Sequence, residues 1–246
     1  MIFTVTRYTT NMAPMYRPLR HDVFKHWSPR MAYVLGFFAA DGTMIANNRG
    51  AHFIEFHNTD RILIVKVKEF LGSGHKISGT RRSPRHKICY RLQIGSKEIF
   101  NDLSNLGFVP NKSNVLQLPS IPERYLSHYV RGYFDGDGNV YFKKHWVKGR
   151  KKKKWIFTSR FTSGSKQYLI DLHCVLKQHG VERGFIIAKS QHKGHDLVFS
   201  HRDSLALYRL MYNTAADTGF FLPRKYKIFQ KAIRTLYPAL DRKSVV

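Results

Sequence analysis

The sequence is poor in acidic residues and has no long apolar run. It contains 16 Asp plus Glu against 42 Lys plus Arg, a formal net charge of +26 over 246 residues. Solubility alone asks for a magnitude of only about 2–8 in a small domain, so the charge predicts a polyanionic partner. No stretch of about 18 apolar residues occurs, and no lipidation signal is present. These absences favour nucleic acid over a membrane surface.

Cysteine is also scarce. Only Cys89 and Cys174 occur, both on apolar phases of their segments, where we expect buried free thiols and no disulfide. The absence of a CxxC pair disfavours a structural zinc site. The chain is nevertheless 43% hydrophobic and 14% aromatic, which is enough for a core and excludes a disordered basic tail. The sequence therefore predicts a folded, strongly basic protein.

An internal repeat organises the chain. YVLGFFAADG at 33–42 returns as YVRGYFDGDG at 129–138. Each copy is followed by two alternating segments, a helical period, two more strand-like segments and a closing helix. Each half is thus predicted to be α-β-β-α-β-β-α. A proline-containing segment joins the halves, and we place the boundary near residue 120.

The predicted elements alternate in the same order in both halves. In the first half we expect strands at 43–48, 52–58, 75–80 and 87–95 and helices at 60–72 and 96–107, the last closing on Gly107. In the second half we expect strands at 139–147, 155–163, 184–191 and 196–201 and helices at 166–180 and 203–213. Lys and Arg fall on one phase of the strands and apolar residues on the other. Each sheet should have a core face and a basic face.

Each motif copy has a glycine in its middle and an aspartate near its end. Gly36 and Gly132 lie in apolar helical runs, where glycine costs about 1 kcal/mol relative to alanine. Close approach of two helices would offset that cost. If the helices cross there, Asp41 and Asp137 arrive together at the two C-terminal ends, where a carboxylate is disfavoured and a second one adds repulsion. The two acids need a cation, and Mg²⁺ suits carboxylate, carbonyl and phosphate oxygens.

The repeated motif resembles the one after which the LAGLIDADG homing endonucleases are named, and two copies in one chain are similar to the monomeric branch of that family. Residues 1–28 have no acid before Asp22, and we interpret them as a basic arm. The resemblance implies an α+β fold with two pseudo-symmetric αββαββα halves at 29–120 and 121–246. The motif helices would pack at the central interface, and the antiparallel sheets would form a DNA-binding saddle. The implied activity is a double-strand break in a long, pseudo-palindromic DNA target by metal-dependent phosphodiester hydrolysis, with one active site per strand.

The resemblance also implies a set of site residues. The metal ligands would be the eighth motif position and the carbonyl before it, which are Asp41, Asp137, Ala40 and Gly136. The sixth position is Ala39 in one copy and Asp135 in the other, so a carboxylate there is not a symmetric requirement. A basic residue after the last helix of each half and a polar residue at the end of the second strand would help to organise water; these are Lys112, Lys225 and Asn58, with Gly164 aligned to Asn58. Mg²⁺ is the expected cofactor, Mn²⁺ a substitute, and Ca²⁺ an ion that supports binding without cleavage.

Polar residues of the strands and their connections are the candidate DNA contacts. They are Asn47, Asn48, Arg49, His52, Arg81, Arg82, Arg85, Arg91, Lys143, Lys144, Arg160, Lys189 and Gln191. A β-ribbon fits the major groove, but for each residue singly a phosphate contact is at least as well supported as a base contact. The run KGRKKKK at 148–154 is predicted to be a hairpin connection that contacts phosphates and gives a steep salt dependence.

Two other functions would use the same basic surface. One is an RNA maturase, alone or bifunctional, that binds its host intron RNA. The other is a non-cleaving DNA-binding regulator, which is disfavoured because two buried like charges at helix C-termini are costly in a pure binder. We expect a monomer with no obligate protein partner and no membrane association. An intron-encoded protein is favoured over an intein, since no splicing-domain sequence flanks the repeats.

Overall fold

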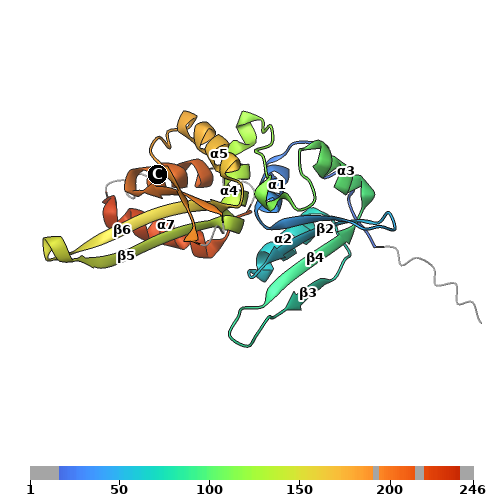
Figure 1. Ribbon diagram of the computed structural model, residues 1–246, viewed down its shortest axis with the longest axis horizontal. Coiled ribbons are helices and arrows are strands. Elements are labelled where there is room, and N and C mark those ends of the chain that lie inside the picture. The colour runs from blue at the N-terminus through green and yellow to red at the C-terminus, as the bar shows by residue number, and fades with distance from the viewer. Residues whose placement is uncertain (1–16, 191–193, 214–218, 239–246) are drawn as a thin grey trace, which may run out of the picture.

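The computed structural model describes residues 17–190, 194–213 and 219–238, and these form two halves of like topology joined at a central pair of helices (Figure 1). Most of the basic arm predicted at 1–28 lies outside the described residues. The first half contains α1 (Pro29–Asp41), β1 (Gly42–Ala46), β2 (His52–Asn58), α2 (Arg61–Phe70), β3 (Ile77–Thr80), β4 (Cys89–Gly95) and α3 (Lys97–Asn105). The short 3-10 helices η1 (Lys112–Asn114) and η2 (Glu123–Tyr125) lie in the link between the halves.

The second half repeats this order with two additions, the short 3-10 helix η3 (Lys148–Arg150) and the helix α7 (Pro223–Leu236). Its other elements are α4 (Leu126–Asp137), β5 (Gly138–Val147), β6 (Lys152–Ser163), α5 (Lys166–Gln178), β7 (Phe185–Ala188), β8 (His195–Ser200) and α6 (His201–Tyr212). The sequence prediction missed α7. Its apolar positions Phe229, Ala232 and Ile233 are buried at helical spacing, but Lys and Arg between them conceal the period, and Pro223 is suited to the first helical position.

Each half builds one antiparallel four-stranded sheet, in the orders β1-β2-β4-β3 and β5-β6-β8-β7. The predicted α+β architecture is therefore confirmed. The β5–β6 hairpin is much longer than its counterpart, with strands of 10 and 12 residues against 5 and 7 in β1 and β2. This hairpin extends away from the molecular centre (Figure 1), and η3 at its tip carries the start of the basic run. The prediction that the whole run 148–154 is a connection is wrong for Lys152, Lys153 and Lys154, which pair with β5 as the first residues of β6.

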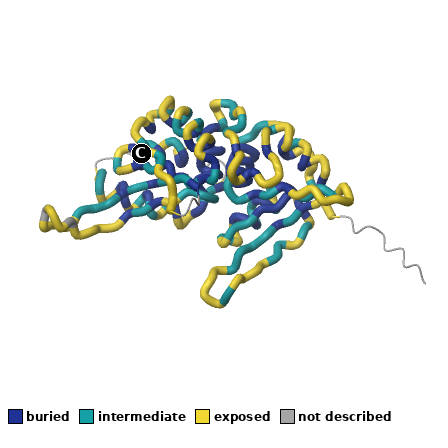
Figure 2. Tube along the Cα trace, in the orientation of Figure 1, coloured by how far each residue is buried: buried dark blue, intermediate teal, exposed yellow. Residues whose placement is uncertain are grey.

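The two faces of each sheet differ as the alternation predicted. In the first half, Ile54, Phe56, Leu92 and Ile94 are buried beneath the helices, and in the second half so are Phe157, Phe161, Leu197 and Phe199. The opposite face carries the polar phase of the strands. Figure 2 shows the buried residues concentrated around the central helices, whereas the hairpin tips are exposed.

The central helices α1 and α4 cross at the two motif glycines, as predicted. A Cβ atom on Gly36 would lie 2.1 Å from the carbonyl oxygen of Tyr129, and one on Gly132 would lie 2.0 Å from that of Tyr33. Only glycine permits this backbone approach. Ser28 caps the start of α1 by accepting a hydrogen bond from the amide of Met31.

Two smaller features bear on the sequence predictions. Gly107 follows α3 with φ at 90°, and the amide of Phe108 donates to the carbonyl of Leu103, so the predicted glycine cap is confirmed. The prediction of buried cysteines is wrong, because Cys89 is half-buried and Cys174 is exposed. Within the described ranges, no helix has both the length and the apolar composition to cross a membrane.

Candidate active site

Two carboxylates end the crossing helices. Asp41 is the last residue of α1 and Asp137 the last of α4, and each is followed by a glycine whose amide donates back into its helix. A Cβ on Gly136 would lie 2.4 Å from the Cβ of Ala40 and 3.3 Å from Oδ2 of Asp41. The small residues before the two acids therefore let the helix ends meet. The crossing places the carboxylate of the first half against the backbone of the second.

The electrostatics of this pair favour a bound cation. The pKa of Asp41 is raised to about 7, chiefly by burial and in second place by the charge of Asp137, while a hydrogen bond from Asn58 and the charges of Lys225 and Lys112 oppose the shift. Burial likewise raises the pKa of Asp137 to about 6, against the charges of Lys112 and Lys225. Such shifts show that the protein and solvent alone do not fully stabilise two negative charges here.

The donor atoms at the site are hard oxygens. No group of three or more His, Cys, Asp or Glu side chains that could hold a metal occurs among the described residues, so a zinc-type centre finds no support there. The two carboxylates and the neighbouring backbone carbonyls instead suit an oxygen-binding ion such as Mg²⁺. The carbonyl of Gly136 is only loosely engaged, at 3.5 Å from Nζ of Lys225.

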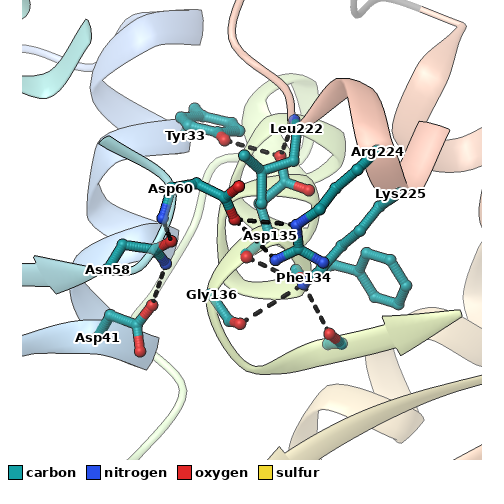
Figure 3. A network of polar contacts seen from close by, with 11 residues as sticks. Tyr33, Asp41, Asn58, Asp60, Phe134, Asp135, Gly136, Leu222, Arg224 and Lys225 are labelled. Carbon is teal, nitrogen blue, oxygen red and sulfur yellow. Dashed lines mark hydrogen bonds and ion pairs between the residues drawn. The ribbon is translucent and has the colours of Figure 1, made fainter. Parts of the chain in front are cut away.

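Two buried lysines flank the carboxylates. Lys112, in η1, donates to the carbonyl of Ala39 at 2.8 Å. Lys225, in the first turn of α7, donates to the carbonyls of Asp135 at 2.9 Å and Gly138 at 2.6 Å, and also to Phe134 (Figure 3). Burial lowers the pKa of each lysine to about 8, although the nearby carboxylates raise it. Each ammonium group therefore lies at a helix C-terminus, the pole that favours a cation.

Asn58 links the end of β2 to the first carboxylate. Its Nδ2 donates to Oδ2 of Asp41 at 2.7 Å, and its Oδ1 accepts from the amide of Asp60 at 2.8 Å (Figure 3). The side chain is thus held at both ends. A hydrogen bond to the charged carboxylate favours ionisation of Asp41.

The counterpart of Asn58 in the second half is Ser163, so the alignment to Gly164 is wrong by one residue. The first strand pairs Gly42 with Phe56 in one sheet and Gly138 with Phe161 in the other, so Phe56 and Phe161 are equivalent. The residues two positions after them, Asn58 and Ser163, are therefore equivalent too. Ser163 Oγ accepts from the amide of Ser165 at 3.1 Å, as Asn58 does from Asp60. Its side chain has no amide with which to donate to a carboxylate in the manner of Asn58.

Each half contacts the β–α turn of the other. Arg224, beside Lys225, pairs with Asp60 at 2.8 Å (Figure 3). In the opposite sense, a Cβ on Gly164 would lie 2.4 Å from the carbonyl oxygen of Ser113, beside Lys112. The two lysine-bearing segments therefore cross the molecular centre in a pseudo-symmetric way.

Two buried polar residues of α4 have structural partners that the sequence did not reveal. Oδ2 of Asp135 accepts from Tyr33 OH at 2.7 Å and from the amide of Leu222 at 2.9 Å, which joins α1 to the start of α7 (Figure 3). The fully buried Arg131 donates to the carbonyl of Phe220 at 2.9 Å. Comparison of the two motif copies could have found these residues, because the apolar Leu35 and Ala39 occupy the equivalent positions in the first copy.

Most of the candidate DNA contacts are solvent-accessible. The exposed ones are Asn47, Asn48, Arg49, Arg81, Arg82, Arg85, Lys143, Lys144 and Lys189, whereas Arg91 and Arg160 are half-buried. Asn47 also shapes its turn, since Oδ1 accepts from the amides of Arg49 and Ala51. His52 lies on the core phase of β2, its ring 4.7 Å from that of Phe100, so it does not lie on the polar face with the other candidate contacts of the strands. Gln191 lies outside the described residues.

Comparison with known proteins identifies a family domain in the first half and the fold of the whole. Residues 28–105 match the model of the LAGLIDADG-like domain. The LAGLIDADG homing endonuclease I-SmaMI bound to cleaved DNA has a TM-score of 0.55 at 12% identity, covering 88% of this chain and 94% of that chain. The meganuclease I-AabMI bound to uncleaved DNA has a TM-score of 0.57 at 14% identity, covering 88% and 92%. The chain therefore has the LAGLIDADG meganuclease fold.

Curated relatives match over a segment of their length. The probable translation initiation factor IF-2 of Thermococcus kodakarensis is 30% identical over 211 residues, 82% of this chain and 15% of that protein. The DNA-directed RNA polymerase subunit Rpo1C of Methanocaldococcus jannaschii is 26% identical over 114 residues, 44% of this chain and 12% of that protein. This chain thus spans less than a sixth of the length of these relatives.

Proposed function

Because the chain is a LAGLIDADG protein with the two-motif fold, we propose that it is a monomeric, site-specific DNA endonuclease. It makes a double-strand break in a long, pseudo-palindromic target by divalent-metal-dependent phosphodiester hydrolysis. The observation that carries the proposal is the meeting of Asp41 and Asp137 at the ends of α1 and α4. Each carboxylate serves one DNA strand.

The residues at the helix ends fit a hard divalent ion. Asp41, Asp137 and the carbonyls of Ala40 and Gly136 would hold it, and Mg²⁺ there supplies a water of lowered pKa and positive charge beside the scissile phosphate. Mn²⁺ replaces Mg²⁺, and Ca²⁺ supports binding without cleavage. The similar protein I-SmaMI is bound to an uncleaved DNA target in the presence of calcium ions in one solved structure, which supports the use of divalent ions here.

The remaining groups of the site orient the carboxylates and place positive charge beside them. Asn58 fixes the orientation of the Asp41 carboxylate through the 2.7 Å hydrogen bond. Lys112 and Lys225 carry positive charge toward the carboxylates, and a pKa of about 8 keeps each of them mostly protonated at pH 7. The net charge of +26 and the basic hairpin tip attract the DNA backbone.

The first step of the test is to identify the DNA target sequence. DNA selected from a random library by cleavage in Mg²⁺ should yield one long, asymmetric site, and Ca²⁺ should support binding without product. Asp41→Asn and Asp137→Asn should each abolish double-strand cleavage of that site while binding survives. Asp171→Asn, on the outer side of α5, is the matched control and should cleave normally. Double-strand cleavage at the unaltered rate by either motif variant would refute the assignment.

A further inference from the structure

Each sheet carries an acid–arginine pair on the face opposite its core. In the first half, Arg91 NH1 on β4 lies 3.5 Å from Glu55 Oε1 on β2. In the second half, Arg160 NH1 on β6 donates to Asp196 Oδ2 on β8 at 3.2 Å. The flanking residues Ile54, Phe56, Phe161 and Leu197 point to the core. Both pairs therefore lie on the polar face of the sheets, which the sequence pattern predicts to be the basic, DNA-binding face.

Within each pair, the acid is covered and the arginine is open. The side chains of Glu55 and Asp196 are 7% and 6% exposed, whereas those of Arg91 and Arg160 are both 42% exposed. Further donors hold the acids: Gln93 Nε2 at 2.6 Å and His57 Nε2 at 2.8 Å for Glu55, and Thr162 Oγ1 at 2.6 Å for Asp196. A covered carboxylate with that many partners is a fixed anchor, and the guanidinium beside it is the group that a ligand can reach.

The two halves hold the pair in opposite arrangements. The registers pair Phe56 with Leu92 in one sheet and Phe161 with Leu197 in the other. Glu55 therefore occupies the position of Arg160, and Arg91 that of Asp196. The acid and the arginine have exchanged strands between the halves, and neighbouring strands are about 4.8 Å apart.

We propose that Arg91 and Arg160 each read a guanine in the major groove, and that Glu55 and Asp196 are positioning residues that fix the two guanidinium groups. Arginine contacts O6 and N7 of guanine with two donors, and a pinned guanidinium loses less conformational freedom on binding. The adjacent carboxylate disfavours a phosphate at the same place. Since the arginines project from non-equivalent strands, the two guanines lie at unequal distances from the centre of the target. This proposal rests on the DNA-binding function proposed above.

The test is the sequence preference of binding. Full-length protein and variants select DNA in Ca²⁺ from a library in which each position of the target is randomised in turn. Arg160→Ala and Arg91→Ala should each remove the preference for guanine at one position, by about 5- to 150-fold, and leave the other positions unchanged. Asp196→Asn and Glu55→Gln should weaken the same two preferences to a smaller extent. Arg81→Ala, on the exposed β3–β4 connection, is the control and should lower affinity equally for all sequences.

An exchange variant tests the geometry directly. Arg160→Glu with Asp196→Arg gives the second half the arrangement of the first, and the preferred guanine should move to the position symmetric with that of Arg91. Retention of every base preference in Arg91→Ala and Arg160→Ala would overturn the proposal, because the pairs would then be plain cross-strand ion pairs. If the alanine variants do not fold, Arg160→Gln and Arg91→Gln keep a long polar side chain and must still lose the guanine preference, because glutamine pairs with adenine and not with guanine. Failure of the unaltered protein to select any sequence would instead refute the proposed function itself.

Discussion

The first motif helix ends beside an amide, whereas the second ends within a lysine network. Asn58 donates to Asp41, but the equivalent Ser163 has no amide to offer Asp137. Conversely, Lys225 contacts four carbonyls around the end of α4, while Lys112 is hydrogen-bonded to Ala39 at the end of α1. The helix crossing and the two terminal acids are common to both halves, and the groups that support them are not. Two equivalent carboxylates can thus be held by different means.

Leucine at the crossing glycines should have the largest effect, because the crossing is the part that the halves share. In Gly36→Leu and Gly132→Leu the new Cβ would lie within 2.1 Å of a backbone carbonyl oxygen of the other helix. Both variants should lose soluble yield and cooperative thermal unfolding. Gly149→Ala is the control, since a Cβ there meets nothing within 4 Å. Normal stability of one variant alone would show that the crossing is not symmetric.

Substitution of the two buried lysines should reveal the difference between the halves. Lys225→Met and Lys112→Met should each lower the rate of cleavage by about 10²-fold, as expected for loss of one positioned cation. Lys225→Met should also lower the melting temperature more, because it strips several buried carbonyls of a donor and each unsatisfied group costs about 1–3 kcal/mol. Lys227→Met, exposed on the same helix, should change neither. Equal destabilisation by the two buried variants would contradict the asymmetry.

The smallest expected difference between the halves is in the pH dependence of stability in the absence of metal. The folded-state pKa of Asp41 is about 7 and that of Asp137 about 6, both above the ordinary value of 3.8. As pH rises between these ordinary and folded-state values, the unfolded state releases the two protons first, so the contribution of each carboxyl to stability falls. At pH 8, Asp41→Asn should raise the melting temperature by several degrees, and Asp137→Asn by less.

The same substitutions should have little effect in acid. Well below the ordinary carboxyl pKa, both groups are protonated in the folded and the unfolded states, so the gain in melting temperature should vanish there. Saturating Mg²⁺ should raise the melting temperature of the unaltered protein at pH 8. The measurement is thermal unfolding of the variants and the unaltered protein over this pH range. A gain that is the same in acid and at pH 8 would contradict the burial of the two charges.

Features with a local signature could be predicted from the sequence. The repeat located α1, α4, their crossing glycines and both acids, and alternation located the strands and the two faces of each sheet. The rest depended on distant partners. Arg131 and Asp135 bond to residues near 220, about 90 positions later, and no local pattern marks such pairs. The alignment of Gly164 slipped because the longer β5–β6 hairpin breaks the spacing of the repeat.

The reciprocal contacts between each lysine-bearing segment and the opposite turn limit how the halves could be exchanged. A half taken from another two-motif protein would need further matching contacts in addition to the glycine at the helix crossing. A replacement second half would need an arginine to meet Asp60 and a glycine to accommodate Ser113. Chimeras built at residue 120 should therefore assemble only when these contacts are transplanted with the half, so the unit of recombination is larger than the motif helix and its sheet.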